Sequence, residues 1–245
     1  LKKYAAVHGE RVRFDEIVFA TKEAWEKYPE IKDMELWPLM KGQTRVLPVS
    51  RLLEDLKVYL GEKSALCYVK NPLVIRRADR VLVEEELQRM VVKFLTERIH
   101  FDAEDVEYRD FHLPEAIFLD LNEYIKIKFV SSPVPGRNRI RLDVVNDDGE
   151  LQRSYSGSLF IDVWKTVPCA ARVLNRKEIL LPEYVRFEKK NLAYIKGEIW
   201  DGQGGPWRIK RPVGVGQVLL RSNLEKAPLI ERGSIVTLKF EGRFV

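Results

Sequence analysis

The sequence predicts an α+β protein of several domains, mainly antiparallel β-sheet with a few short helices. Three observations indicate this fold class: strand-like alternation of apolar and charged residues, one long amphipathic helix pattern, and a short β-rich pattern that occurs twice near the C-terminus. The chain has 245 residues, of which 45% are apolar, which is enough for more than one core. We therefore expect an N-terminal α/β segment (1–75), a domain of one helix on an antiparallel sheet (76–164), and a β-rich domain (165–245).

The N-terminal segment opens with a strand, a turn, a second strand and a short helical start over residues 7–17. Ser50 is predicted to be the N-cap of a later helix, because its hydroxyl can accept a hydrogen bond from a free N–H group of the first turn. Gly61 is expected to end that helix in the C′ position. One stripe of the helix carries four leucines, Leu52, Leu53, Leu56 and Leu60.

The middle segment contains the strongest helix pattern and two clear strand patterns. After the helix, the spacing of apolar residues changes from helical to alternating, which predicts half-buried strands. Residues 146–149 (Asn-Asp-Asp-Gly) then predict a turn into a further strand through Leu159 and Ile161. The helix stripe is Leu87, Met90, Val91, Phe94, Leu95 and Ile99, and the strand residues are Ile125, Ile127 and Phe129, then Ile140, Leu142 and Val144.

A pattern of fourteen residues occurs twice in the third segment, at 172–185 and again 39 residues later at 211–224. Each copy runs from an arginine through an apolar stretch and a turn to an apolar run ending in Leu-Leu, and then to a polar turn closed by an apolar residue. We expect Ile179, Leu180, Val218 and Leu219 to be buried in short strands. The polar turns, Pro182-Glu183 and Ser222-Asn223, are expected to begin a single helical turn each.

A glycine-rich loop, residues 198–207, lies between the two copies. Its glycines would suit a phosphate-binding loop only if they directly preceded a helix, so that backbone N–H groups converged on the ligand. Pro206 and the alternating residues 207–211 predict a strand instead. The loop is therefore interpreted as a hairpin loop.

The sequence predicts no catalytic centre, no metal site and no cofactor. The three histidines, His8, His100 and His112, lack the spacing of a zinc site. The pairs His100 with Asp102 and His112 with Asp110 are interpreted as solvated or capping groups. Carboxylate pairs occur in evident turns, at Glu104-Asp105 and Asp147-Asp148.

The two cysteines, Cys67 and Cys169, stand among apolar neighbours and far apart in the sequence. Neither has a histidine nearby in sequence to activate it as a nucleophile. We expect two buried free thiols, and a single disulfide bond is the alternative.

Charged residues of both signs make up 32% of the chain, and the net charge is +5. This balance indicates a surface of salt bridges more than a nucleic-acid-binding face. No apolar run approaches the roughly 20 residues that a membrane span needs, so no membrane insertion is expected. Residues 1–4 are too short for a signal peptide, and if the protein is exported, its leader has been removed.

Residues 167–185, 215–220 and 227–238 together resemble the SAF (antifreeze-like) domain, in the form found in flagellar basal-body P-ring formation proteins, the FlgA family. The order of helix, strand pair and SAF-like module is similar to that family. Residues 7–17 and 41–52 look like the extra N-terminal segment of its longer members. Family members usually continue past the Arg-Gly-Ser-Ile-Val strand at 232–236, so the domain is expected to be truncated after Val245.

The resemblance implies a periplasmic chaperone that assists flagellar P-ring assembly by transient binding of the P-ring subunit, with no catalysis and no cofactor. Candidate contact residues are Tyr194, Trp200 and Trp207 around the glycine-rich loop, although each can equally serve as ordinary core or hairpin packing. Two alternatives stay open: a SAF-domain pilus assembly protein, and a substrate-capping domain of a sugar-acid enzyme. The oligomeric state is not predicted.

Overall fold

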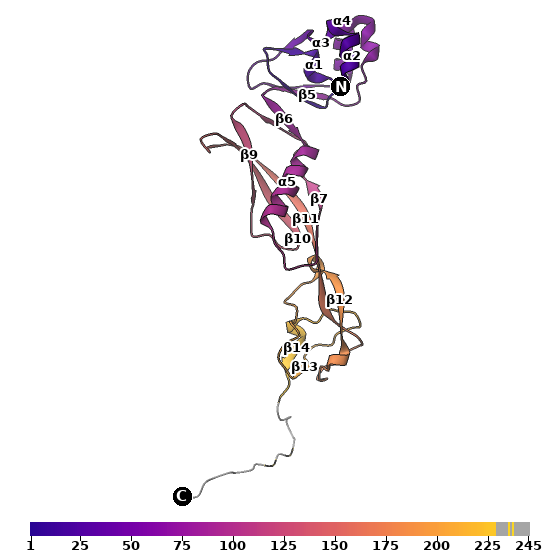
Figure 1. The fold of residues 1–245 in the computed structure, drawn as a ribbon, viewed down its shortest axis with the longest axis vertical. Helices are drawn as coiled ribbons and strands as arrows, with labels where there is room; N and C mark the ends of the chain where they lie inside the picture. Colours follow the sequence, from indigo (N-terminus) through magenta and orange to yellow (C-terminus); the bar gives the residue numbers. More distant parts are fainter. Residues whose placement is uncertain (229–234, 236, 238–245) are drawn as a thin grey trace. The chain divides into compact units, whose positions relative to one another are not determined.

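The computed structural model describes residues 1–228, 235 and 237. Figure 1 shows the course of the chain with its helices and strands labelled. The chain divides into two compact units. Unit 1 contains Leu1–His100 and Tyr108–Phe160, and unit 2 contains Phe101–Glu107 and Ile161–Val245. The expected division at residues 75 and 164 stays a prediction. The segment at 229–238, apart from Ile235 and Thr237, lies outside the described residues, and so does the strand expected at 232–236.

The N-terminal part of unit 1 places short helices against small sheets. Strand β1 pairs in parallel with β5, β5 pairs antiparallel with β4, and β2 forms a separate two-stranded antiparallel sheet with β3. Helix α4 buries Leu52, Leu56 and Leu60 against this core. The elements are β1 (Tyr4–Val7), β2 (Arg11–Arg13), α1 (Phe14–Ile17), α2 (Lys22–Lys27), α3 (Pro29–Lys32), β3 (Glu35–Pro38), β4 (Thr44–Leu47), α4 (Val49–Leu60), η1 (Gly61–Leu66) and β5 (Leu73–Arg77).

Two details of the predicted α4 helix are wrong. The N-cap is Pro48, and Ser50 lies inside the first turn. The Pro48 backbone is extended, with ψ at 154°, and the helix begins directly after it. Leu53 is 39% exposed, because it lies about 100° around the helix from the buried Leu52. Gly61 ends the helix as predicted, with a φ of 56° that favours glycine, although it is the C-cap residue and not the C′ residue.

The rest of unit 1 is helix α5 with antiparallel strands. Helix α5 buries Leu87, Val91 and Leu95, three residues of the predicted stripe. Strand β9 pairs with β10 in the register that the alternating patterns require, with Leu142 opposite Ile127. The elements are β6 (Arg80–Val83), α5 (Glu84–Arg98), β7 (Asp105–His112), β8 (Ala116–Leu119), β9 (Glu123–Phe129), β10 (Gly136–Asn146) and β11 (Leu151–Ala170), of which β7 and β11 continue into unit 2.

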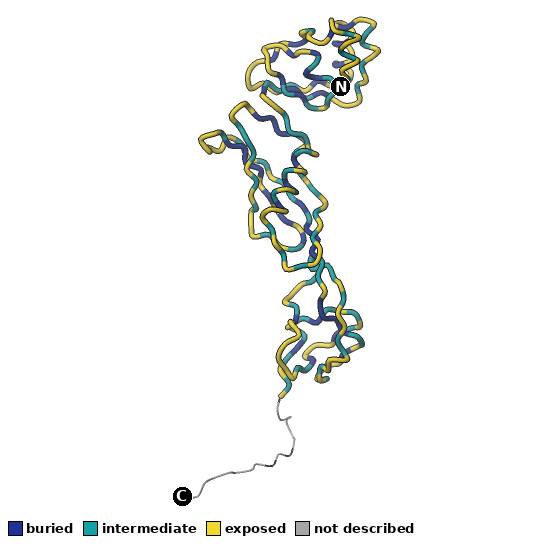
Figure 2. The backbone as a smooth tube through the Cα atoms, in the orientation of Figure 1, coloured by how far each residue is buried: buried dark blue, intermediate teal, exposed yellow. Residues whose placement is uncertain are grey.

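Unit 2 is built from short strands and single 3₁₀ turns around a small core (Figure 2). One residue of this core cluster, Ala170, comes from β11, and the others come from the two sequence copies and the segment between them. The elements that follow β11 are η2 (Pro182–Tyr184), β12 (Val185–Asn191), η3 (Leu192–Tyr194), β13 (Trp207–Ile209), η4 (Arg221–Asn223) and β14 (Leu224–Lys226). The predicted helical turns of the two copies are confirmed as η2 and η4. The fold class, α+β with mainly antiparallel sheet, is confirmed as well.

The two sequence copies pair with each other at equivalent positions. The Leu174 N–H donates to the Val213 carbonyl at 2.9 Å, and the Val213 N–H donates to the Leu174 carbonyl at 3.0 Å. These residues are 39 positions apart, as the copies are, so the pairing relates the copies by an approximate two-fold axis. Both side chains are buried. The repeated pattern therefore forms one core.

Each copy turns its chain with the same hydrogen bonds. In copy 1 the Asn175 N–H donates to the Glu178 carboxylate at 2.8 Å, and in copy 2 the Gly214 N–H donates to the Gln217 side chain at 2.8 Å. In both turns the residue before the acceptor has a positive φ, 69° at Lys177 and 72° at Gly216.

The expected burial of the Leu-Leu runs is only partly right. Leu219 is buried, Leu180 and Val218 are half-buried, and Ile179 is 40% exposed. The two runs form isolated β-bridges at Ile179 and Val218 instead of regular strands. Leu180 packs against the core cluster, so the alternation of side chains along this extended run turns Ile179 to the surface.

Candidate functional site

An apolar groove of about 280 Å³ lies on unit 2. Its walls come from the end of copy 1, the start of β12 and the glycine-rich loop. The side chains that give it its apolar character are Leu180, Leu181, Val185, Phe187, Trp200 and Trp207. Phe187 is 67% exposed, so a large aromatic surface faces solvent at the rim. Exposed apolar surface around a concave site is typical of a protein-binding surface.

Trp200 forms part of the core beneath the groove. It is 8% exposed and packs in the cluster that contains Leu219 and Leu224. Its backbone N–H donates to the Leu219 carbonyl at 2.9 Å. Its indole Nε1 is buried and has no hydrogen-bond partner among the described residues. An unpaired buried N–H group carries a cost of about 1–3 kcal/mol.

Trp207 forms the wall beside the glycine-rich loop. Its indole Nε1–H donates to the Gln203 carbonyl at 2.9 Å, which holds the ring against the loop. A Cβ atom at Gly204 would lie 3.6 Å from this ring, and one at Gly205 would lie 3.5 Å from it. Both glycines also have positive φ, 73° and 139°. The glycines therefore serve a tight loop that lies on a tryptophan, and not a helix-capping phosphate site. The hairpin-loop interpretation is wrong in one respect, because the two ends of the loop do not pair with each other: Ile199 bridges Leu220, whereas β13 pairs with β14.

The three predicted contact residues have different positions. The structure brings Trp200 and Trp207 together in the groove. Tyr194 ends the short turn η3, is 68% exposed and lies outside the groove lining. Sequence reasoning missed Phe187, although the alternation of Val185 and Phe187 with charged neighbours along β12 was a usable signal.

Copy 1 is held rigid beside the groove by a charged cluster. The Arg172 guanidinium lies 3.7 Å from the centre of the Tyr184 ring and pairs with the Glu178 carboxylate. The pKa of Glu178 is lowered, first by the backbone N–H of Asn175 and then by Arg172. The same ion pair raises the pKa of Arg172. Arginine stacked on an aromatic ring in this way fixes the corner from which the groove wall extends.

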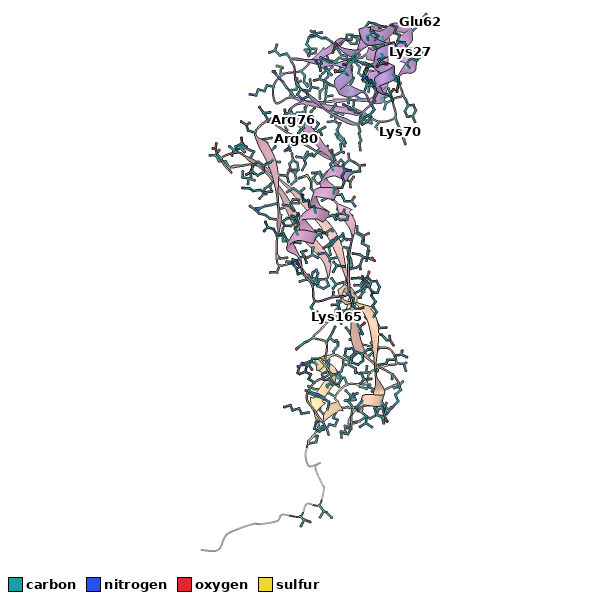
Figure 3. The ribbon with its side chains drawn as sticks, viewed as in Figure 1. Lys27, Glu62, Lys70, Arg76, Arg80 and Lys165 are labelled. Carbon is teal, nitrogen blue, oxygen red and sulfur yellow. The ribbon has the colours of Figure 1, made fainter. Side chains whose placement is uncertain are left out.

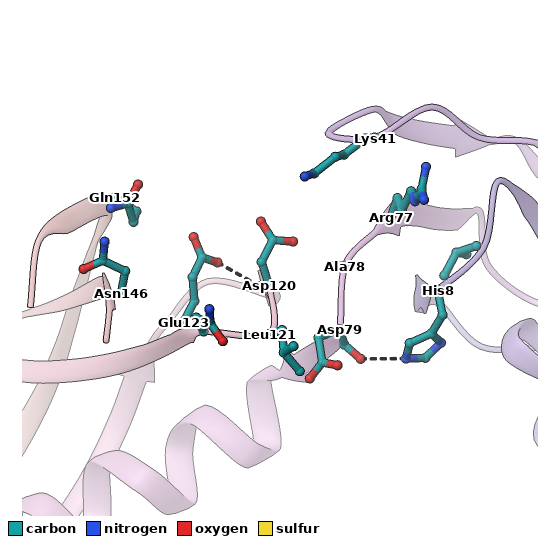
Figure 4. A pocket seen from close by; sticks show the side chains of 12 residues that line it. His8, Lys41, Arg77, Ala78, Asp79, Asp120, Leu121, Glu123, Asn146 and Gln152 are labelled. Carbon is teal, nitrogen blue, oxygen red and sulfur yellow. Dashed lines mark hydrogen bonds between the residues drawn. The ribbon is translucent and has the colours of Figure 1, made fainter. Parts of the chain in front are cut away.

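A second, polar recess of about 550 Å³ lies in unit 1 (Figure 4). The His8 ring stands at its edge, with Nε2 at 2.9 Å from the Asp79 carbonyl and Nδ1 at 3.1 Å from the Glu16 carboxylate. Lys41 and Asp120 also line it (Figure 4). Its mixture of acidic, basic and amide groups contrasts with the apolar groove and suits water and ions more than apolar side chains.

The histidine and aspartate pairs considered from sequence do not form acid–base dyads. His112 Nδ1 lies 3.0 Å from the backbone carbonyl of Asp110, while the Asp110 carboxylate pairs with Arg109 at 2.7 Å. Asp102 pairs with Lys165 at 2.5 Å, and Lys165 is labelled in Figure 3. Across the described part of the chain, no group of three or more His, Cys, Asp or Glu side chains could hold a metal ion.

Both cysteines are free thiols. Cys169 is buried and Cys67 is half-buried, and burial raises the pKa of each thiol. A raised pKa keeps a thiol protonated and unreactive near neutral pH. Within residues 1–228, no helix is both long and apolar enough to cross a bilayer.

Comparison with protein families matches residues 165–245 to a family described as the chaperone for flagella basal body P-ring formation. A search of proteins with curated functions gives no match. Three solved structures are similar. The flagellar protein FlgA from Thermotoga maritima MSB8 has 17% identity, covers 96% of this chain and 81% of its own, and has a TM-score of 0.37.

The other two similar structures are of Salmonella FlgA. The closed form has 11% identity, a coverage of 61% of this chain and 73% of its own, and a TM-score of 0.40. The open form has 12% identity, a coverage of 61% and 66%, and a TM-score of 0.36. At these identities and TM-scores, the three likenesses add nothing to the family match.

Proposed function

Because residues 165–245 match the family described as the chaperone for flagella basal body P-ring formation, we propose that this chain assists P-ring assembly by binding the P-ring subunit transiently. The whole apolar groove, from Leu180 to Trp207, falls inside the matched residues. That coincidence is the observation that carries the proposal. The match favours this function over pilus assembly and over the capping of a sugar-acid enzyme. The assignment of the matched residues to the SAF domain stays a prediction.

The groove has the chemistry that a chaperone of this kind needs. A subunit that has not yet assembled exposes apolar surface, and an apolar groove with an aromatic rim can cover part of it. Phe187 and Trp207 present flat, rigid side chains, which lose little conformational entropy on binding. Binding without catalysis is sufficient for this role. Assembly of a ring around the flagellar rod places the proposed site of action in the periplasm.

The proposal is tested with purified P-ring subunit. A pull-down measures binding, and light scattering measures aggregation of the subunit with and without the chain. We expect the chain to bind and to delay aggregation. Phe187→Ser is expected to weaken both effects about tenfold, because it removes most of the exposed aromatic surface of the rim.

A size-matched control is Phe19→Ser, which changes a phenylalanine that is 79% exposed in unit 1. In the parent chain, Phe19 lines an apolar recess of about 440 Å³ together with Trp25 and Tyr68. We expect this variant to bind like the parent chain. Loss of binding in Phe19→Ser alone would move the client site to unit 1, and absence of binding by the unsubstituted chain would refute the proposed function.

A further inference from the structure

One edge of copy 2 is already occupied by an extended segment of the same chain. Residues 198–200 lie antiparallel to residues 219–221, with a β-bridge between Ile199 and Leu220. The Trp200 N–H donates to the Leu219 carbonyl at 2.9 Å, and the Arg221 N–H donates to the Glu198 carbonyl at 2.8 Å. The Trp200 side chain then fills the space beside Leu219 and Leu224.

The equivalent edge of copy 1 lies 39 residues earlier, at residues 180–182. It has the same backbone arrangement, because the Leu180 N–H donates to the Trp207 carbonyl at 2.9 Å, as the Leu219 N–H donates to the Pro168 carbonyl at 2.9 Å. In the described part of the chain, no backbone N–H donates to the Leu180 carbonyl. Leu181 is 39% exposed.

The space beside that edge is the apolar groove. The counterparts of Leu219 and Leu224, the residues that hold the Trp200 side chain in copy 2, are Leu180 and Val185 in copy 1. Both line the groove. The groove is therefore the place where a side chain equivalent to Trp200 would lie if a strand docked on copy 1.

We propose that the groove binds an extended segment of the P-ring subunit, which docks on residues 180–182 as residues 198–200 dock on copy 2. The segment places a large apolar side chain between Leu180 and Val185, and the N–H of that residue donates to the Leu180 carbonyl. This is strand addition at a sheet edge, in which backbone hydrogen bonds set the direction and a pocket selects the side chain. The proposal rests on the proposed function and specifies its mode of binding.

Pro182 makes this contact weaker than its counterpart. It occupies the position of Arg221, whose N–H completes the second hydrogen bond in copy 2. Proline has no N–H, so a strand on copy 1 can form only one of the two hydrogen bonds. A segment held by one hydrogen bond and an apolar side chain is released readily, which suits a chaperone that must give up its client.

The probe is a synthetic peptide that copies residues 195–201, Ile-Lys-Gly-Glu-Ile-Trp-Asp, because this segment shows which chemistry fits the edge. Added to the isotope-labelled full chain, it is expected to shift the amide signals of Leu181 and Phe187 and to compete with the P-ring subunit. Methylation of the backbone nitrogen of the peptide's Trp removes the N–H that donates to the Leu180 carbonyl, and it should weaken binding about fivefold or more. The control is methylation of the backbone nitrogen of the second Ile of the peptide, because this N–H points away from the edge.

A substitution that increases affinity provides the more specific test. Pro182→Ala restores the missing N–H and should tighten binding of both peptide and subunit about threefold to tenfold. Pro212→Ala, at an exposed position outside the groove lining, should leave both affinities unchanged. A misfolded Pro182→Ala variant would not bind both probes more tightly, so this result cannot arise from misfolding.

The outcomes separate the two proposals. If the subunit binds but neither Trp methylation nor Pro182→Ala changes the affinity of any probe, strand docking is overturned while the chaperone function stands. Cross-strand contacts between Leu180 and this chain's own residues 229–245 in the free protein would also overturn it. If the peptide behaves as expected but the subunit does not bind, the edge is a strand site and the proposed function fails.

Discussion

At the scale of single residues, Trp200 separates the cost of lost packing from the cost of an unpaired N–H group. Trp200→Ala is expected to lower the free energy of unfolding by about 3–5 kcal/mol, because it leaves a cavity in the unit 2 core. Trp200→Phe should cost less than about 1 kcal/mol, because removal of the unpaired indole N–H offsets part of the smaller cavity. Urea unfolding followed by circular dichroism measures both values.

An equal cost of the two substitutions would contradict this expectation. If Trp200→Phe costs as much as Trp200→Ala, the indole N–H has an acceptor outside the described residues, and its hydrogen bond contributes to stability. Trp207→Phe is the matched variant, since its indole N–H does have an acceptor at Gln203. It is expected to cost about 1 kcal/mol more than packing alone predicts.

Asp143 is the buried carboxylate of unit 1 with the richest set of donors. Its side chain is 2% exposed, and it accepts a hydrogen bond from the Ser154 hydroxyl at 2.8 Å. Lys128 lies 3.2 Å away and Arg141 2.8 Å away. Burial acts to raise the pKa of Asp143, but Ser154, Lys128 and Arg141 together outweigh it and hold the pKa below its ordinary value of 3.8.

This lowered pKa predicts a pH-dependent stability. Asp143 stabilises the fold at pH values above 3.8, and its contribution is lost as the pH falls from there through the folded-state pKa. Asp143→Asn is expected to lower the free energy of unfolding by about 1–3 kcal/mol at pH 7, with a smaller difference at pH 3. Asp147→Asn, in the exposed turn, is the control. A difference that does not change between pH 7 and pH 3 would contradict the assignment.

At the scale of elements, the turns of the two copies provide matched positions. Lys177 and Gly216 are equivalent and both have positive φ, a region in which side chains other than glycine are strained. Lys177→Gly is therefore expected to raise the free energy of unfolding by up to about 1 kcal/mol, and Gly216→Ala to lower it by about 1 kcal/mol. Thermal unfolding of the two variants, each against the parent chain, checks the signs.

The surroundings of the two turns suggest what a result of the other sign would mean. A Cβ atom at Gly216 would lie 3.3 Å from the Arg186 guanidinium, which is flexible enough to move. A stabilised Gly216→Ala variant would mean that the turn relaxes out of the left-handed region. An unchanged Lys177→Gly variant would mean that the entropy of the unfolded chain cancels the strain that is relieved.

Local patterns predicted most elements because their causes are local. The alternation around Ile127 and Leu142 requires a half-buried strand pair, and the structure has this pair in the expected register. Errors arose where a neighbour decides the outcome. Pro48 replaces Ser50 as the N-cap of α4, and the pairing of Leu174 with Val213 joins the two copies in a way that no local pattern predicts. The first error is local, because Pro48 stands only two residues before Ser50. The second depends on two residues 39 positions apart, a contact that periodicity does not reveal.

The candidate site was predictable to the same extent. The two tryptophans flanking the glycine-rich loop were visible in the sequence, and the structure brings both into one groove. The edge at residues 180–182, on which no described segment docks, was not visible, because it emerges only when the hydrogen bonds of the two copies are compared. Repetition in the sequence indicated two similar corners. Only the folded structure shows that residues 198–200 dock on the edge of copy 2 and that no described segment docks on the edge of copy 1.

At the scale of the whole molecule, the two units have separate cores. The buried cluster that includes Leu52 and Leu73 belongs to unit 1, and the cluster around Leu174 and Leu219 belongs to unit 2. Strand β11 is the longest element and contributes residues to both units. Separate cores favour independent unfolding, whereas a shared strand favours cooperation.

We expect the separate cores to dominate, so that heating produces two transitions. Leu219→Ala, at a fully buried position of unit 2, should destabilise one transition by about 2–5 kcal/mol and leave the other in place. Leu87→Ala, fully buried in α5, should do the reverse. Calorimetry locates the transitions, and hydrogen exchange measured by mass spectrometry assigns each to its unit. If both variants shift a single transition, β11 couples the units into one cooperative block, and the client groove then shares the stability of the entire chain.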